Sequence, residues 1–250
     1  KEMEIYAPAS LKRVGEYAFS GCEKLSFTAD EPLNLSDVTE LGQNAFANCS
    51  SLGYVTLGEG LTAIPDNAFN YCGLRDIKIP STVTSIGNSA FANNGFADAG
   101  ELVLPDGLTS IGDSAFYRSL ATGKDSGFTS ITIPASVESI GSQAFYNHRR
   151  LTEVTVEGTS TGDGSSALTE VGSAAFGIDN YSAYATNGSF EDPINPEIVY
   201  TGEIGAMFNL PEEVAERNLF INGSTCYTGN ITPLTYVQTV PATCTVAGYH

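Results

Sequence analysis

The sequence predicts an α/β solenoid, in which about seven repeats of 22–31 residues stack into a parallel β-sheet with short helical turns. The phrase TSIGNSAF at 84–91 returns as TSIGDSAF at 109–116. Its reduced pattern, an aliphatic residue, Gly, two variable residues and Ala-Phe, occurs seven times, once with Pro65 in place of Gly. Successive phenylalanines are 27, 23, 22, 25, 29 and 31 residues apart. A period of this length is typical of solenoids, because one repeat cannot bury its apolar face alone.

A half-buried strand is predicted in the first part of each repeat. The segments 52–65, 74–87, 102–112 and 128–141 alternate between apolar and polar residues. In the second of them, Ile77 and Ile79 would point inward, while Asp76 and Lys78 would point outward. Proline ends the predicted strand in three repeats, because it cannot donate the next hydrogen bond of a ladder. The strand is therefore expected to be followed by a turn and a second extended segment.

The second part of each repeat is predicted to be a corner followed by a short helix. The Gly of the phrase permits a tight corner. The next residue is mostly of a type that can cap a helical turn. Ala permits close packing, and Phe fills the space between coils. We therefore expect one internal stack made of Phe19, Phe46, Phe69, Phe91, Phe116, Phe145 and Phe176.

The pattern LxxIxIPxxVxxIGxxAFxxC resembles the BspA-like, or treponemal-type, leucine-rich repeat of bacterial and some protist surface proteins. Residues 72–91 match it closely, and the resemblance covers about residues 1–200. The pattern's cysteine is kept only at Cys22, Cys49 and Cys72, and residues 30–37, 119–127 and 157–169 are interpreted as insertions. The resemblance implies a leucine-rich-repeat solenoid at the bacterial cell surface or secreted, and we expect a secretory leader before residue 1.

Two regions are predicted, a leucine-rich-repeat solenoid over 1–205 and a C-terminal cap with the start of a following module over 206–250. The segment LPEEVAERNLF at 210–220 has the features of a capping helix, with Pro at its start and acids in its first turn. Such a helix would cover the apolar edge of the last coil.

The charge of the chain is strongly acidic, with a formal net charge of −18. Residues 1–150 have a balance of −7 and residues 151–250 one of −11. This charge disfavours nucleic acid and anionic membranes as partners, because phosphates would be repelled. No apolar run is long enough to span a membrane. We expect a monomer that neither binds nucleic acid nor inserts into a membrane.

The five cysteines fall into two groups. Cys22, Cys49 and Cys72 each follow the repeat phenylalanine by three residues and are predicted to be buried, free thiols. Cys226 and Cys244 lie outside the repeats. They could pair with each other or with a cysteine elsewhere in a longer protein, and the sequence leaves both alternatives open.

No constellation of catalytic residues or metal ligands stands out. His148, followed by two arginines, is expected to be exposed to solvent, and His250 is the last residue. There is no nucleophile-elbow motif and no zinc-binding spacing. The segment TGDGSS at 161–166 lacks the alternating ligands of a calcium loop and is interpreted as an insertion. The sequence thus predicts a protein that is not an enzyme and has no cofactor or metal.

The outward face of the predicted sheet is the candidate binding surface. An extended, rigid face suits a large partner, and tyrosines with small hydroxyls and acids can serve recognition. The candidate ligand-binding residues are Tyr6, Tyr54, Thr56, Asp76, Lys78, Ser130 and Thr132. The favoured hypothesis is an adhesin-like module for an extracellular protein or glycan of a host or neighbouring cell. A structural spacer and a glycan-docking accessory of a larger surface enzyme are the alternatives.

Overall fold

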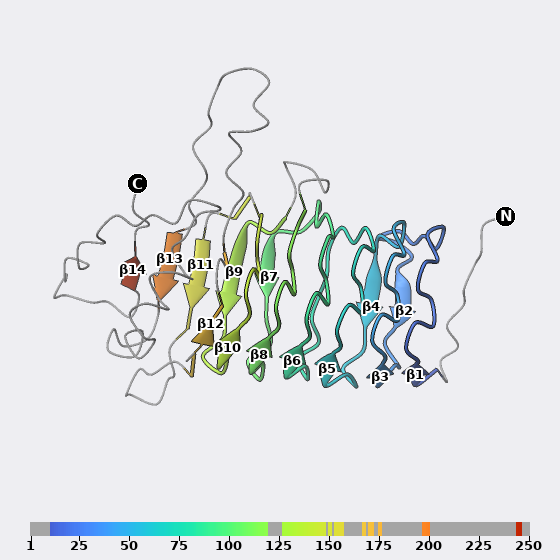
Figure 1. Cartoon of the computed structure of the whole chain (residues 1–250), viewed down its shortest axis with the longest axis horizontal. Helices are drawn as coiled ribbons and strands as arrows, with labels where there is room; N and C mark the ends of the chain where they lie inside the picture. The colour runs from blue at the N-terminus through green and yellow to red at the C-terminus, as the bar shows by residue number, and fades with distance from the viewer. Residues whose placement is uncertain are drawn as a thin grey trace, which may run out of the picture.

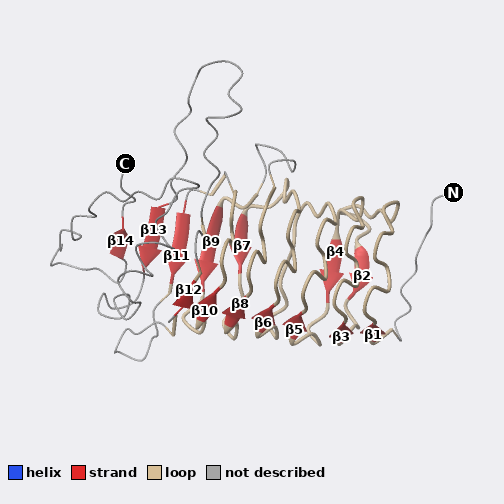
Figure 2. Ribbon diagram, in the orientation of Figure 1, coloured by secondary structure: helices blue, strands red, loops and turns tan. Residues whose placement is uncertain are grey.

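The chain winds into successive coils whose strands form two rows along one long axis (Figure 1). The structure is a computed structural model that describes residues 11–119, 127–148, 150–151, 153–157, 167–168, 170–172, 175–176, 197–200 and 244–246. The two rows are joined by turns and loops, drawn in tan in Figure 2. The predicted solenoid and its parallel sheets are confirmed.

The first row contains the strands that begin each repeat. β2 (Leu33–Leu35) and β4 (Val55–Leu57) form a two-stranded parallel sheet. A second sheet has the order β14-β13-β11-β9-β7. Its strands are β7 (Glu101–Val103), β9 (Ser130–Ile133), β11 (Glu153–Val156), β13 (Glu197–Tyr200) and β14 (Cys244–Val246). All pair in parallel except β14, which is antiparallel to β13.

The row is interrupted at 74–80, so its strands form two separate sheets and not a single one. No strand forms there, although the predicted alternation holds: Ile77 and Ile79 are buried while Asp76 and Lys78 are exposed. The N–H of Ile77 donates to the carboxylate of Asp76 at 2.8 Å. A side chain of this segment therefore satisfies a backbone donor that a sheet ladder would otherwise use.

The second row contains the predicted second extended segment, here as strands of two residues. β1 (Arg13–Val14) pairs with β3 (Glu40–Leu41). A five-stranded parallel sheet is built from β5 (Ala63–Ile64), β6 (Ser85–Ile86), β8 (Ser110–Ile111), β10 (Ser139–Ile140) and β12 (Glu170–Val171). The register keeps the aliphatic residues opposite one another, and their side chains are buried.

The seven phenylalanines form the predicted internal stack. Neighbouring ring centroids are 5.1–5.5 Å apart and their planes are within 14° of parallel. From Phe46 to Phe145 the side chains are almost completely buried. Leu, Ile and Val from both rows pack around the stack in one continuous core.

The segment around each Ala-Phe is a pair of turns, and the expected short helices are absent from the described residues. The N–H groups of Asn44, Phe46 and Asn48 donate to carbonyls of the next coil at 3.1, 2.9 and 2.8 Å. In a helix these groups would bond within the segment. Asn44 and Asn48 have left-handed φ angles of 55° and 62°, which also excludes a right-handed helix.

The corner glycine is required by close contact between coils. An added Cβ on Gly141 would lie 2.4 Å from the backbone nitrogen of Asp113 in the preceding coil. The residue after the glycine does not cap a helix either. The carboxylate of Asp113 accepts the N–H of Ser142 in the next coil at 2.7 Å, and Asn88 does the same for Asp113 at 2.8 Å. These side chains therefore link coils at the corner.

The first predicted insertion, 30–37, has the wrong boundaries, because it includes β2. The additional residues precede this strand, where the backbone of Thr28 and Glu31 forms a turn. Most of the other two insertions, 119–127 and 157–169, lies outside the described residues, as does the proposed capping helix at 210–220. The division at 205/206 stays a prediction.

Candidate functional site

The predicted binding residues lie along the outward face of the first row. Thr56, Asp76 and Lys78 are exposed, while Tyr54, Ser130 and Thr132 are half-buried. Thr132 lies between Val103 and Thr155 in the ladder, and its hydroxyl donates to the carboxylate of Glu101 at 3.0 Å. Tyr6 is outside the described residues. We call this surface, formed by Tyr54 and the outward residues of β4, 74–80, β7 and β9, the sheet face.

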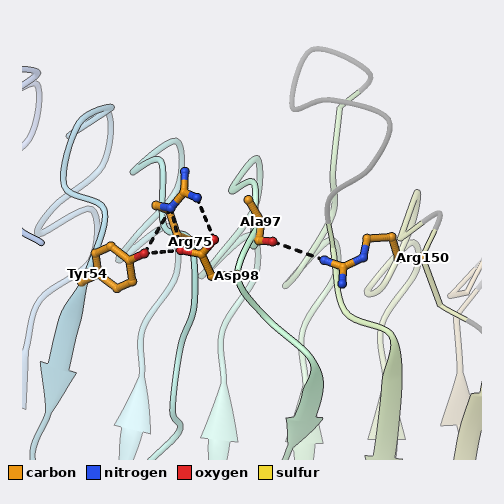
Figure 3. A network of polar contacts seen from close by, with 5 residues as sticks. All are labelled: Tyr54, Arg75, Ala97, Asp98 and Arg150. Atoms are coloured by element: carbon orange, nitrogen blue, oxygen red, sulfur yellow. Dashed lines mark hydrogen bonds and ion pairs between the residues drawn. The ribbon is translucent and has the colours of Figure 1, made fainter. Parts of the chain in front are cut away.

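One edge of the sheet face, next to the beginning of β4, carries a polar cluster of Tyr54, Arg75 and Asp98 (Figure 3). The Tyr54 hydroxyl donates to Oδ2 of Asp98. Arg75 holds the same carboxylate in a bidentate pair, with Nε and one Nη each 2.7 Å from an oxygen. Arg75 Nε also lies 3.1 Å from the Tyr54 hydroxyl oxygen. The three side chains come from three successive coils and link them at their edge.

The electrostatics of this cluster follow from the contacts. The Arg75 guanidinium, with help from the Tyr54 hydroxyl, lowers the pKa of Asp98 to about 2. The hydrogen bond to the Asp98 carboxylate raises the pKa of the Tyr54 phenol, because that carboxylate favours the protonated form. Arg75 and Asp98 are exposed and Tyr54 is only half-buried, so the cluster orients Tyr54 and adds little stability.

Arg75 and Asp98 were missed in the sequence. Asp98 belongs to the segment 97–100, and the Phe91-to-Phe116 step is three residues longer than the shortest step of 22. The longer step is the feature of the sequence that could have indicated additional residues at this point of the repeat. Nearby, Arg150 donates to the carbonyl oxygen of Ala97 at 3.3 Å, so a more distant coil also contacts the segment.

A second set of polar side chains lies inside the solenoid, three residues after each phenylalanine. Cys49, Cys72, Asn94 and His148 each bond to the carbonyl oxygen of the phenylalanine in the preceding coil, at 3.0, 2.9, 2.8 and 2.7 Å. The three repeat cysteines are free thiols, as predicted, although Cys22 is only partly buried. Burial raises the pKa of the Cys72 thiol. These side chains therefore link neighbouring coils by hydrogen bonds inside the solenoid.

The expectation that His148 is exposed is wrong, because its side chain is 1% exposed. Nδ1 accepts the N–H of Phe128 at 3.2 Å, and Nε2 therefore carries the proton that is donated to Phe116. Burial, followed by the charge of Arg118, lowers the pKa of His148 to about 3. The neutral ring stacks on Phe128, with centroids 4.9 Å apart. The imidazole thus belongs to the core.

The part of the chain that the structure describes has neither a metal-binding cluster nor a membrane-spanning helix. It contains no group of three or more His, Cys, Asp or Glu residues placed to hold a metal ion. No helix there is long and apolar enough to cross a membrane.

The repeats identify the family. The sequence profile described as "BspA type Leucine rich repeat region" matches residues 32–124 and 121–197, with six copies. These residues make up more than half of the chain, and the chain belongs to this family. Among curated proteins, the sequence has no match.

Three solved structures are similar. A leucine-rich repeat protein from Bacteroides ovatus is 24% identical, with a TM-score of 0.49 over 66% of this chain and 44% of that one. The T. pallidum leucine-rich repeat protein is 24% identical, with a TM-score of 0.44 over 66% and 69%. A leucine-rich cell surface protein from Faecalibacterium prausnitzii is 23% identical, with a TM-score of 0.36 over 66% and 48%. The chain spans less than half of the first and third proteins.

Proposed function

We propose that the chain is a non-catalytic recognition module, secreted or on the surface of a bacterial cell, that binds a macromolecule of a host or neighbouring cell through its sheet face. The observation that carries this proposal is the geometry of that face. Thr56, Asp76, Lys78 and Val103 are exposed on consecutive coils held by a rigid core. A rigid platform lowers the entropy lost on binding.

The composition of the sheet face favours a protein partner over an anionic polymer. Lys78 is exposed beside the acids Asp76 and Glu101, and Arg75 is a second exposed cation that is paired with Asp98. Val103 adds an apolar side chain that is 64% exposed. A surface with both charges and an exposed apolar group is typical of protein interfaces, whose specificity depends on charge complementarity.

Tyr54 is the proposed aromatic anchor. Because its hydroxyl is held by Asp98 and Arg75, its ring is already oriented before a partner binds. A tyrosine whose ring is already oriented loses little side-chain entropy when a partner binds. Asp98 is therefore a positioning residue, and Asp98→Ala should weaken binding without removing a contact residue.

The test is a binding screen of the whole chain against immobilised extracellular-matrix proteins and glycans, followed by variants. Lys78→Glu should weaken binding to any retained component about tenfold or more, because a contacting charge is reversed. Lys24→Glu is the matched control, since Lys24 is also exposed but is not one of the residues that form the sheet face. Equal effects of the two variants would indicate a net-charge effect and contradict the assignment. Binding to no component would favour the structural spacer.

A further inference from the structure

A second exposed surface lies on the turns that surround the phenylalanine stack. In each of the four coils from Phe19 to Phe91, the turn contains two residues with left-handed φ, located two positions before and two positions after the phenylalanine. We define the turn face as these two positions and the one directly after the phenylalanine, in the four coils from Phe19 to Phe91. Asparagine and glycine adopt left-handed φ most readily among amino acids. Asn44, Asn48, Asn67 and Asn93 fill four of the eight left-handed positions.

Two tyrosines depart from this rule. Tyr17 and Tyr71 have φ angles of 55° and 56°, in a region that disfavours bulky residues. Their side chains are 63% and 46% exposed, so they bury little apolar area in return. Neither side chain is hydrogen-bonded to another residue in the described ranges. Backbone strain that brings no packing gain is a mark of functional positions.

The surroundings of Tyr71 supply oriented amides. Asn70 donates to Oδ1 of Asn67 at 3.2 Å, and Asn93 donates to Oδ1 of Asn70 at 3.3 Å. These three side chains come from the coil of Tyr71 and the next one. The amides are therefore ordered beside an exposed aromatic ring, and an amide group has both donors and acceptors, although Oδ1 of Asn93 is buried.

The turn face is also neutral. None of its positions in these four coils holds Asp, Glu, Lys or Arg, although the chain has a net charge of −18. The coil step repeats at 5.1, 5.4 and 5.5 Å between ring centroids. The positions of the turn face therefore recur at a nearly constant step, although Ala47 and Ala92 among them are buried. A regular step suits a polymer with repeating units.

We propose that the turn face is a binding site for a neutral polysaccharide chain. Exposed aromatic rings bind the C–H faces of sugars, and amides donate to and accept from sugar hydroxyls. An uncharged ligand fits a surface without charge, whereas an anionic polymer would meet the net negative field of the molecule. This site is on other residues than the sheet face and goes beyond the proposed function, so either can fail without the other.

The test uses the full chain and four oligosaccharides. Cellohexaose, mannohexaose and laminarihexaose are the neutral probes, and a hyaluronan oligosaccharide is the charged one. The chain has no tryptophan, so its intrinsic fluorescence comes from tyrosine and reports on rings that a sugar covers. We expect at least one neutral probe to bind and quench this fluorescence, and the charged probe to bind more weakly.

The decisive variant is Tyr17→Asn combined with Tyr71→Asn. Asparagine suits left-handed φ better than tyrosine, so the double variant should have a higher thermal midpoint and yet bind the sugar about tenfold more weakly or worse. Ser114→Asn is the matched control, because Ser114 has φ 55° in the next coil outside the turn face. It should raise the midpoint and leave the affinity unchanged.

Three results would overturn the proposal. They are binding to none of the neutral probes, unchanged affinity in the double tyrosine variant, and equal loss of affinity in Ser114→Asn. A destabilised double variant would contradict the strain argument on which the assignment of the two tyrosines depends.

Discussion

Asn94 and His148 occupy the same repeat position, and each bonds to the carbonyl oxygen of the phenylalanine in the preceding coil. The Asn94 amide nitrogen is 2.8 Å from the oxygen of Phe69, and His148 Nε2 is 2.7 Å from that of Phe116. Both side chains also accept a backbone N–H, from Leu74 and Phe128 respectively. A short amide and an imidazole therefore perform the same task, but only the imidazole can be protonated.

His148 should make the solenoid sensitive to acid. Its pKa is lowered to about 3 in the folded chain, from an ordinary value of 6.5. Between these values the unfolded chain binds more protons, so stability is fully present above about pH 6.5 and falls as the pH is lowered toward 3. In this range, His148 alone should change the free energy of unfolding by up to about 1.4 kcal/mol per pH unit.

The comparison with His148→Asn isolates this effect in denaturant melts at several pH values. The variant should lose the His148 component of the slope, because asparagine satisfies the same position in the coil of Asn94. Surface carboxylates such as Asp98, with its pKa of about 2, contribute equally to both proteins. Parallel stability curves for the two proteins from pH 6.5 to 4 would show that His148 is not buried as a neutral ring.

The corner glycines offer a matched pair of substitutions. Gly141→Ala should cost about 1–3 kcal/mol or more, because the new Cβ would lie 2.4 Å from the Asp113 nitrogen. Gly15→Ala should change stability by less than about 0.5 kcal/mol, since no atom of the described residues lies within 4 Å of its added Cβ. Both can be measured by urea unfolding. Similar losses would mean that conformational freedom, and not contact between coils, explains the glycine.

Much of the architecture could be predicted from the sequence because it depends on local, repeated patterns. The period, the phenylalanine stack and the buried faces of Ile77 and Ile79 all follow from spacing. The turns could not be predicted in the same way. Gly-x-x-Ala-Phe suits a short helix by local preference, and only hydrogen bonds to the next coil, such as Phe46 to Ala68, favour the left-handed turn.

The side-chain contacts between coils could not be predicted from the sequence either. Tyr54 and Asp98 are separated by 44 residues, and their meeting depends on how coils of unequal length align. His148 was expected to be exposed because two arginines follow it. Its burial depends on its position after Phe145, which the repeat phase indicated and the local charge obscured.

The phenylalanine stack and the sheet face should differ sharply in their tolerance of substitution. Phe91→Ala should cost about 3–5 kcal/mol, because it leaves a cavity between two stacked rings. Thr132→Ala loses a hydrogen bond to Glu101 that is open to solvent and should stay within about 0.5 kcal/mol. Denaturant melts of the two variants check this, and comparable losses would contradict the assignment of inside and outside.

Hydroxyl-radical footprinting of the chain bound to a protein partner from the screen tests the central claim most directly. Val103 and Tyr71 are suitable reporters, because they are 64% and 46% exposed and lie on the sheet face and the turn face respectively. Recognition through the sheet face predicts that binding strongly reduces oxidation of Val103 and leaves Tyr71 unchanged. Protection of Tyr71 with unchanged oxidation of Val103 would contradict it.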